Sequence, residues 1–566
     1  MSKKKIGTKI RKIYDLRHMV RTSIEIYREE TAFLERKEGV YTPITYDQLG
    51  HDLDALGCAL FERGIRGRIA VMGENGYFWA LSYLVAVCGL GVVVPLDKEL
   101  PAEEVKNIAN IANLDAIICS DKLVNKTEGI DGVDVIPFSR IPELIEEGKK
   151  CISESKTTYL VAPIDREIMS VLLFTSGTTG VSKGVMLSHK NICTVLEAAA
   201  GFDDVGPGDV FLSVLPLHHV FECSCGFLAP LFVGGAIAYC TGLRHIIADM
   251  KDSRVTKIMC VPLLLETMYK KIWQTAKKQG KDKALRAAIK LNRASKKIGV
   301  DLSKKLFSDI HNMFGGRLGL FICGGAAADP EIIAGMRDLG FHAIQGYGLT
   351  ECAPVAAINL ETCFRDASAG LTPKYGELTV MDKSDDGTGE ICYRGDNVML
   401  GYYDAPDLTD EVIIDGWFHT GDLGYIDDDG FLYITGRKKN VIVTNGGKNV
   451  FPEELETYLS RSPYVKESVV VGYMNDAKRD YDIVAIIHPD NDALKEILGN
   501  RYTEQDVRRV LKEAVSEVNE IVQSYKHINY FVIREEEFVK NSSRKIKRNA
   551  SISEEAKDKY LKLLNK

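Results

Sequence analysis

The feature that most constrains the fold is a regular alternation of short apolar runs with longer stretches of helical character, which starts near Arg68. RIAVM is followed by ENGYFWALSYLVAVC, and GVVVPL is followed by PAEEVKNIANIAN. The rhythm returns in VFLSVLPL, KIMCVP and LGLFICGG. Alternating strands and helices are typical of a parallel α/β sheet. The sequence therefore predicts one large doubly wound α/β region that extends beyond residue 350.

The sequence pattern changes after this region. Between Gly370 and Tyr433 short β-like runs such as GELTVMD and GEICYRG are separated by glycine and aspartate turns, which predicts a small β subdomain. The helix FPEELETYLSRS, several strands and a helix from Glu504 to Val522 follow. A chain of 566 residues is too long for one compact core. We therefore expect a large α/β domain with a β subdomain at 1–436 and a small α+β domain at 437–566.

One uncharged stretch, Phe78 to Leu96, is nearly long enough to span a bilayer. Gly89 and Gly91 argue for a buried helix that ends there, and the three valines that follow read as a core strand stopped by Pro95. A helix followed by a strand is the favoured interpretation. A membrane segment is the alternative.

Charge and cysteine usage exclude several classes of protein. The formal net charge is -7 and the pI is near 6.0, so no global electrostatic attraction to nucleic acid is expected. The 13 cysteines lack zinc-like pairing and are interpreted as reduced thiols. The basic start of the chain is not followed by the apolar core of a secretory signal. A cytoplasmic protein that binds small molecules is expected.

The most informative segment is VLLFTSGTTGVSKG, from Val171 to Gly184. An apolar strand delivers a loop of glycines and hydroxyls that ends at a lysine, and such a loop suits polyphosphate because backbone N–H groups, hydroxyls and one cation converge. The alternative is a polar connecting loop without a binding role. The lysine spacing is not that of a Walker A loop. The candidate nucleotide-binding residues are Thr175, Ser176, Gly177, Thr178, Thr179, Gly180 and Lys183.

This loop resembles the phosphate loop TSGTTGxPKG of the adenylate-forming superfamily of acyl-CoA synthetases, luciferases and adenylation domains. Ser182 stands where the proline usually is, which removes none of the donors. PLHHVFE, GGAAAD, QGYGLTE, GWFHTGDLG and GRKKN follow in the order expected of that family, over almost the whole chain. The resemblance implies an α/β fold with a small, mobile C-terminal domain.

The resemblance also implies roles in the large domain. His219 would lie beside the acyl and thiol channel, although a histidine without such a role is the alternative. Tyr347 would stack on adenine, Thr350 would bind phosphate and Glu351 would hold Mg²⁺, which prefers carboxylate and phosphate oxygens. The other nucleotide-binding candidates are the small residues and the glutamine of GGAAAD and QGYGLTE: Gly324, Gly325, Ala326, Gln345, Gly346 and Gly348.

Further roles are implied towards the C-terminus. Asp422 matches the carboxylate that accepts the ribose hydroxyls, and Arg437 matches a ribose-side arginine. Lys439 falls on the hinge about which the small domain rotates between two half-reactions. Lys545 matches the catalytic lysine of the tail, with Arg544 in place of the usual glycine. An ordinary basic tail is the alternative, and Lys547 is a second candidate. The GGKN element, 446–449, resembles the loop that meets the thiol.

These matches imply an enzyme that uses ATP, Mg²⁺ and CoA to convert a carboxylic acid into acyl-AMP and then acyl-CoA. The long basic helical stretch from about Lys270 to Phe314 resembles long-chain fatty acyl-CoA synthetases and favours a fatty acid. Leu285, Ala288, Ile289 and Ala294 are spaced for a buried stripe. The basic residues between them suit contact with an anionic membrane surface, and a solvated face is an equal alternative.

Other functions remain as alternatives. An adenylating ligase that passes the acid to an acyl carrier protein thiol, or an aryl or medium-chain acid:CoA ligase, would carry most of the same motifs. A non-catalytic nucleotide sensor is disfavoured because it would not retain the hinge and the mobile lysine together. A homodimer and a contact with the membrane periphery are left open.

Overall fold

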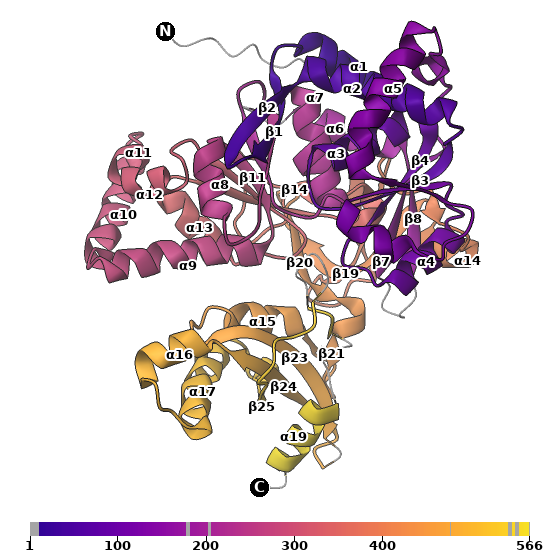
Figure 1. Ribbon diagram of the computed structural model, residues 1–566. Helices are drawn as coiled ribbons and strands as arrows, with labels where there is room; N and C mark the ends of the chain where they lie inside the picture. Colours follow the sequence, from indigo (N-terminus) through magenta and orange to yellow (C-terminus); the bar gives the residue numbers. More distant parts are fainter. Residues whose placement is uncertain are drawn as a thin grey trace. The chain divides into compact units, whose positions relative to one another are not determined.

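The computed structural model describes residues 11–176, 182–201, 205–475, 477–540, 546–548 and 554–564 (Figure 1). The chain forms two compact units. The first comprises Met1–Leu378, Tyr393–Phe418 and Asp428–Leu432, and the second comprises Thr379–Cys392, His419–Asp427 and Tyr433–Lys566. A large α/β part and a smaller C-terminal part are therefore confirmed.

The first unit contains an eight-stranded sheet that is parallel at its centre. The pairings of β9, β10, β11 and β12 run parallel, and the outer pairs β1/β2 and β13/β14 are antiparallel. In sheet order the strands are β14 (Ala357–Ile358), β13 (His342–Tyr347), β12 (Leu320–Cys323), β11 (Lys257–Cys260), β9 (Val210–Ser213), β10 (Ala236–Tyr239), β1 (Thr31–Lys37) and β2 (Val40–Thr45).

A seven-stranded sheet forms the other layer of this unit. Its central strands are buried on both faces, which explains their unbroken apolar runs: Ile69 and Val71 of β3 pack in one core cluster, Ala70 and Met72 in another. In sheet order the strands are β17 (Gly401–Tyr402), β8 (Ser182–Ser188), β7 (Met169–Ser176), β4 (Gly91–Leu96), β3 (Gly67–Met72), β5 (Ala116–Cys119) and β6 (Asp134–Pro137).

The prediction of one doubly wound region was wrong in this respect, because the α/β rhythm is divided between the two sheets. The alternation of strands and helices predicts the order of the elements, but it does not predict which sheet each strand joins. The helices of this unit are α1 (Leu16–Ile26), α2 (Tyr46–Glu62), α3 (Tyr77–Val85), α4 (Ala102–Ile111), α5 (Ile141–Ser153), α6 (His189–Ala199), α7 (Ala229–Val233), α8 (Ile246–Ser253), α9 (Pro262–Lys278), α10 (Asp282–Lys297), α11 (Ser303–Leu306), α12 (Ser308–Met313), α13 (Pro330–Asp338) and α14 (Pro406–Asp410).

The uncharged stretch from Phe78 to Leu96 is a helix followed by a strand, as predicted. Helix α3 continues into a π-helical turn, η1 (Ala86–Leu90), and β4 begins at Gly91 with φ of +143°. A Cβ at Gly91 would stand 2.2 Å from the Gly67 carbonyl oxygen, so only glycine fits. The strand continues through Pro95 instead of stopping there. Within the described residues no helix is both long and apolar enough to cross a membrane.

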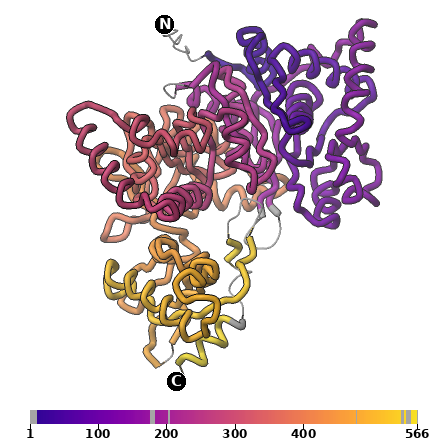
Figure 2. Tube along the Cα trace, turned by 60° about the vertical axis from the view of Figure 1, so that its left-hand side comes forward, coloured from indigo at the N-terminus to yellow at the C-terminus, as the bar shows by residue number. Residues whose placement is uncertain are grey.

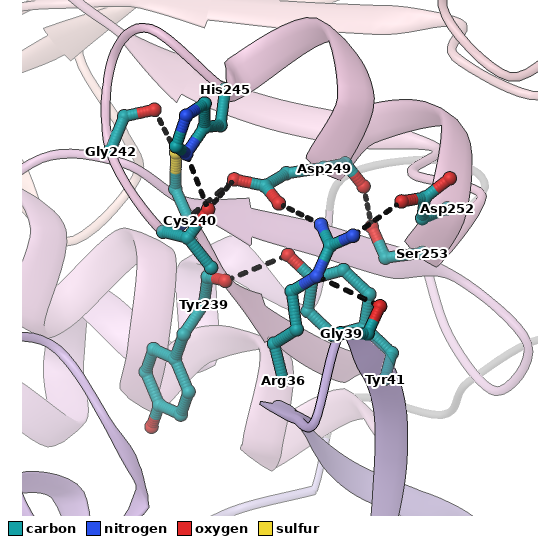
Figure 3. A network of polar contacts seen from close by, with 11 residues as sticks. Arg36, Gly39, Tyr41, Tyr239, Cys240, Gly242, His245, Asp249, Asp252 and Ser253 are labelled. Atoms are coloured by element: carbon teal, nitrogen blue, oxygen red, sulfur yellow. Dashed lines mark hydrogen bonds and ion pairs between the residues drawn. The ribbon is translucent and has the colours of Figure 1, made fainter.

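The outer hairpin of the eight-stranded sheet is fastened to α8 by a polar network (Figure 3). The Arg36 guanidinium donates to Asp249 at 2.7 Å and to Asp252 at 2.9 Å, and the Tyr41 hydroxyl donates to the Tyr239 carbonyl at 2.9 Å. Asp249 is fully buried and also accepts the backbone N–H of Thr241. A buried carboxylate needs such partners, so this network stabilises the sheet edge.

The expected β subdomain is a five-stranded sheet built from β15 (Gly376–Met381), β16 (Gly389–Gly395), β18 (Ile413–Ile414), β19 (Trp417–Ile426) and β20 (Leu432–Arg437). A three-stranded sheet with helices on both faces lies in the second unit. Val470 packs in one cluster with α15 and α17, and Val469 packs in another with α19. These elements are α15 (Pro452–Leu459), β23 (Val465–Asn475), β24 (Asp480–Pro489), α16 (Asn491–Leu498), α17 (Glu504–Ile521), β25 (Tyr530–Ile533) and α19 (Glu554–Leu564).

Candidate active site

The predicted phosphate loop connects two paired strands in the sequence. Strands β7 and β8 pair antiparallel, with Thr175 directly opposite Lys183, and the Thr175 hydroxyl donates to the Lys183 carbonyl at 3.4 Å. Lys183 therefore lies on the strand that follows the loop, beside the end of β7. Gly177, Thr178, Thr179 and Gly180, together with the side chain of Ser176, lie outside the described residues.

Tyr402 joins two of the predicted site residues. Its strand, β17, pairs with β8, and the Lys183 ammonium stands 5.0 Å from the centre of the Tyr402 ring. The Tyr402 hydroxyl donates a 2.9 Å hydrogen bond to Glu351 Oε1. Burial and the Glu351 carboxylate raise the pKa of Tyr402, so its hydroxyl stays a donor. Lys183, the cation of the phosphate loop, thus contacts the Tyr402 ring, and Glu351, the candidate metal ligand, contacts the Tyr402 hydroxyl.

GGAAAD and QGYGLTE leave the eight-stranded sheet side by side. Strands β12 and β13 are parallel neighbours, with Cys323 opposite Gln345, so the two segments emerge at the same carboxyl edge. Ligands of α/β sheets bind at this edge. Gly325 has φ of +84°, and Thr350 and Glu351 open a short 3₁₀ turn, η6 (Thr350–Cys352).

Two residues of these segments are constrained by packing. The Gln345 side chain accepts from the Ala328 N–H at 3.0 Å and donates to the Asp366 carbonyl at 2.8 Å, so its amide braces the loop from within the protein. A Cβ at Gly348 would stand 1.5 Å from the Pro354 carbonyl oxygen, and glycine is therefore required there. Ala326, Gly346 and Tyr347 lie on the same two segments.

The segment with His219 is fixed by an asparagine that sequence reasoning missed. Asn75 Nδ2 donates to Ser213 Oγ and to the Leu215 carbonyl, and its Oδ1 accepts from the Leu217 N–H at 3.1 Å. The rings of His218 and His219 are 4.3 Å apart. Burial and the neighbouring His219 lower the pKa of His218 to about 3, so His218 is neutral.

The helix after His219 touches both sheets. Phe221 packs against Gly324, where a Cβ would stand 2.8 Å from the Phe221 ring, so PLHHVFE and GGAAAD are in contact. The π-helical turn η5 (Glu222–Leu228) follows. Cys223 and Ser224 line a small apolar pocket together with residues of α3, α6, β7 and β8: Tyr83, Val171, Leu173, Leu187 and Ile192.

Glu222 is a second group that sequence reasoning missed. It is 0% exposed, and burial raises its pKa to about 8 against the smaller, opposite effect of the nearby Ser213 hydroxyl. The carboxyl packs on Gly226, where a Cβ would stand 2.7 Å from Glu222 Cδ. A carboxyl group with this pKa is mostly neutral at pH 7. Its position in PLHHVFE is visible in the sequence, but its burial is not.

The ribose candidates form an ion pair in the second unit. Asp422 lies on β19, Arg437 ends the adjacent strand β20, and Arg437 Nε is 2.8 Å from Asp422 Oδ1. Asp422 is buried, whereas Arg437 is exposed. Lys439 lies in the next turn, η7 (Lys438–Asn440), and burial together with the Arg437 guanidinium lowers its pKa. Lys438 is held by Glu390 at 2.9 Å.

The tail residue Lys545 lies outside the described residues, but residues on both sides of it are anchored. Lys540 and Ile546 form a β-bridge, and the Lys547 N–H donates to the Val539 carbonyl at 2.8 Å. Arg548 donates to Glu456 Oε2 at 2.6 Å. Gly446, Gly447 and Lys448 of GGKN lie in the exposed turn between β21 (Ile442–Val443) and β22 (Asn449–Val450), and Asn449 begins β22.

Comparison with known proteins identifies the family of the chain. Residues 20–403 match the family described as AMP-binding enzyme, and residues 439–558 match the AMP-binding enzyme C-terminal domain. Long-chain-fatty-acid--CoA ligase 5 of Rattus norvegicus is 30% identical over 504 residues, which are 80% of this chain and 72% of the rat protein. Fatty acyl-CoA synthetase A of Dictyostelium discoideum is 29% identical over 83% of this chain and 75% of its own.

Among solved structures, an anthranilate CoA ligase in complex with anthranoyl-AMP superposes with a TM-score of 0.75 over 96% of this chain and 98% of its own, at 19% identity. That likeness shows a shared fold. Because the family match spans well over half of the sequence, the chain belongs to the AMP-binding enzyme family, as an acid:thiol ligase of the adenylate-forming kind that its motifs predicted.

Proposed function

We propose that this enzyme converts a long-chain fatty acid into its acyl-CoA thioester by way of acyl-AMP. In the first half-reaction the acid carboxylate attacks the α-phosphorus of ATP, a new P–O bond forms and the bond to pyrophosphate breaks. In the second, the CoA thiol loses its proton, its sulfur attacks the acyl carbonyl and AMP leaves. The observation that carries the proposal is the placement of two site residues around Tyr402. The Lys183 ammonium lies over the Tyr402 ring, and Glu351 accepts a hydrogen bond from the Tyr402 hydroxyl.

This placement suits the charge that develops in phosphoryl chemistry. Negative charge accumulates around the α-phosphorus, and a fixed cation, together with a metal ion held near the phosphates by a carboxylate, would stabilise it. The residues fit Mg²⁺, because Glu351 offers a hard oxygen ligand oriented by the Tyr402 hydroxyl. No group of three or more His, Cys, Asp or Glu side chains in the described ranges could hold a metal. Mg²⁺ would therefore be completed by ATP phosphates and water, and it would supply charge neutralisation.

The remaining roles follow the family motifs. Asp422 accepts hydrogen bonds from the ribose hydroxyls, and its ion pair with Arg437 orients it for that task. Thr175, Thr178 and the neighbouring loop donors bind phosphate, and Tyr347 stacks on adenine. Lys545 supplies a cation in the first half-reaction, and the chain turns at Lys439 before the second.

A fatty acid is proposed for three reasons. The relatives named above are fatty acyl-CoA and long-chain-fatty-acid--CoA ligases. The long basic helical stretch from about Lys270 to Phe314 resembles that of long-chain fatty acyl-CoA synthetases. Each methylene buried in apolar surroundings contributes roughly 0.8 kcal/mol, so a long acid would gain binding that acetate cannot.

The test is a panel of acids from acetate to stearate, with benzoates, assayed for pyrophosphate release with ATP, Mg²⁺ and CoA. We expect kcat/KM to rise steeply with chain length towards palmitate. A maximum for acetate or benzoate would contradict the fatty-acid assignment. Replacing CoA by acyl carrier protein in the same assay distinguishes the thiol acceptors. Exchange of labelled pyrophosphate into ATP that does not depend on any acid would contradict the adenylating mechanism itself.

A further inference from the structure

The segment from Lys270 to Lys305 concentrates positive charge in an otherwise acidic chain. It contains 13 Lys and Arg side chains and two carboxylates, whereas the whole chain has a formal net charge of -7. Most of these cations belong to α9 and α10. Figure 1 shows the two helices at the periphery of the first unit, and Figure 2 shows the same segment at its outer side. A local field of this kind attracts anionic partners.

Helix α10 has two apolar faces, of which only one is used by the fold. Leu285 and Ile289 face inward and pack in the core that covers the eight-stranded sheet. The outward stripe repeats at intervals of three and four residues, so its members lie on one face of the helix. It consists of Ala284, Ala287, Leu291, Ala294 and, just beyond the helix end, Ile298.

This outward stripe is solvent-exposed in the first unit. Leu291 is 54% exposed and Ile298 is 78% exposed, and the nearby Val300 is 46% exposed. A helix on the surface of a domain needs one apolar stripe, facing the core. The second stripe, which contains a leucine and an isoleucine, is not used in the packing of this unit and is therefore available to a binding surface.

A row of basic residues borders the stripe with the same spacing. It consists of Lys283, Arg286, Lys290, Arg293 and Lys297. Two of the five are engaged within the protein: the Arg286 guanidinium lies 4.8 Å from the centre of the Trp273 ring, and Arg293 is ion-paired with Asp338. The ammonium groups of Lys283, Lys290 and Lys297 are on exposed side chains. Apolar and cationic rows therefore run side by side along the outer face of α10.

We propose that this outer face of α10 docks the enzyme on the surface of an anionic lipid membrane. Amphipathic helices with Lys and Arg beside Leu and Ile bind in this way, with the apolar stripe among the acyl chains and the cations on lipid headgroups. A second copy of the chain is a poor occupant, because two such faces would oppose like charges. The proposal deepens the proposed function and takes its purpose from it, since long-chain acids partition into bilayers.

The experiment is flotation of the full-length protein with vesicles of phosphatidylcholine alone or mixed with phosphatidylglycerol, at low and high salt and without ATP or CoA. We expect binding to the anionic vesicles, weakened by salt, and little binding to phosphatidylcholine. Equal binding to both vesicle types, or binding to neither, would overturn the proposal. Retention on an acidic protein such as acyl carrier protein, with no vesicle binding, would also overturn it.

Two variants locate the surface. The triple variant Lys283→Glu, Lys290→Glu, Lys297→Glu should weaken vesicle binding about 100-fold or more. Its matched control, Lys106→Glu, Lys495→Glu, Lys512→Glu, makes the same charge change at exposed lysines elsewhere and should retain nearly all binding. Leu291→Gln with Ile298→Gln should weaken binding without a charge change, whereas Ile497→Gln, at a residue 50% exposed, should not. If both triple variants lose binding equally, α10 is not the docking face.

Because vesicle binding is measured without substrates, the two proposals fail separately. A protein that binds vesicles but prefers benzoate would refute the fatty-acid assignment alone. A protein that uses palmitate but ignores anionic vesicles would refute the docking surface alone. Turnover of a short soluble acid should be unchanged in the triple variant, and turnover of palmitate supplied in anionic vesicles should fall.

Discussion

The Tyr402 hydroxyl donates a hydrogen bond of 2.9 Å to Glu351, across 51 residues of sequence. Strand β17 is only two residues long, and its pairing with β8 brings Tyr402 to the phosphate hairpin. The carboxylate that is proposed to hold Mg²⁺ is thereby oriented by a side chain that also lies under the Lys183 ammonium.

Tyr402→Phe tests this relationship. The variant keeps the ring under Lys183 but leaves Glu351 without its donor, so we expect a higher Mg²⁺ requirement and a kcat/KM for MgATP lowered on the order of 10-fold or more. The measurement is acid-dependent pyrophosphate release as a function of Mg²⁺ concentration. Tyr403→Phe, which removes the hydroxyl of the next residue, is the control. An unchanged Mg²⁺ dependence would separate Tyr402 from the metal site.

Glu222→Gln tests the buried carboxyl. With an ordinary pKa of 4.5 raised to about 8 in the folded protein, the native state binds the proton more tightly than the unfolded chain. Its contribution to the free energy of unfolding is therefore fully present below about pH 4.5 and is lost as the pH rises towards about 8.

The neutral amide lacks this loss, so the variant should gain stability over the wild type by a few kcal/mol between pH 5.5 and pH 8. The measurement is the difference in melting temperature between the two proteins across that range. Glu513→Gln, at an exposed position, should show no such trend. A constant difference between Glu222→Gln and wild type at every pH would mean that the native carboxyl is not neutral.

The sequence predicted the elements better than their arrangement. The helix and strand within Phe78–Leu96 follow from Gly89 and Gly91, because glycine ends a helix locally. The division into two sheets does not follow, because pairing of distant strands leaves no local signal. The same limit applies to Tyr402, whose bond to Glu351 depends on the neighbourhood of β8 and β17 and not on any spacing.

The candidate site was predictable where one short segment carries a group of residues. The phosphate hairpin, GGAAAD and QGYGLTE each gather their chemistry within a few positions, and the parallel pairing of β12 and β13 brings the last two together. The hydrogen bond of the Gln345 amide to the protein backbone and the burial of Glu222 both result from packing, which sequence patterns do not predict. The domain boundary near residue 437 and the hinge remain predictions.

Asp422→Ala tests the ribose assignment. Loss of two charge-assisted hydrogen bonds should cost about 3 kcal/mol of nucleotide binding. We therefore expect the KM for ATP to rise by roughly 100-fold while the KM for the acid changes little. The variant also releases Arg437 from its 2.8 Å ion pair, so Arg437→Ala is assayed beside it to separate the two effects. If neither the KM for ATP nor kcat changes, Asp422 does not contact the nucleotide.

The two lysines should fail in different half-reactions. Lys545→Ala removes a cation from the charge that develops at the α-phosphorus. This should slow acyl-AMP formation by on the order of 10² to 10³ but leave the conversion of supplied acyl-AMP to acyl-CoA active.

Lys439→Pro fixes φ within η7 and restricts rotation about the proposed hinge, so acyl-AMP should form and accumulate. Lys438→Pro is not a suitable control, because Lys438 is ion-paired with Glu390, and Lys439→Ala serves instead by retaining a flexible backbone. Single-turnover quantification of acyl-AMP and acyl-CoA distinguishes these outcomes. Equal impairment of both steps in both variants would refute the assignment of Lys545 to the first half-reaction and of Lys439 to the turn between them.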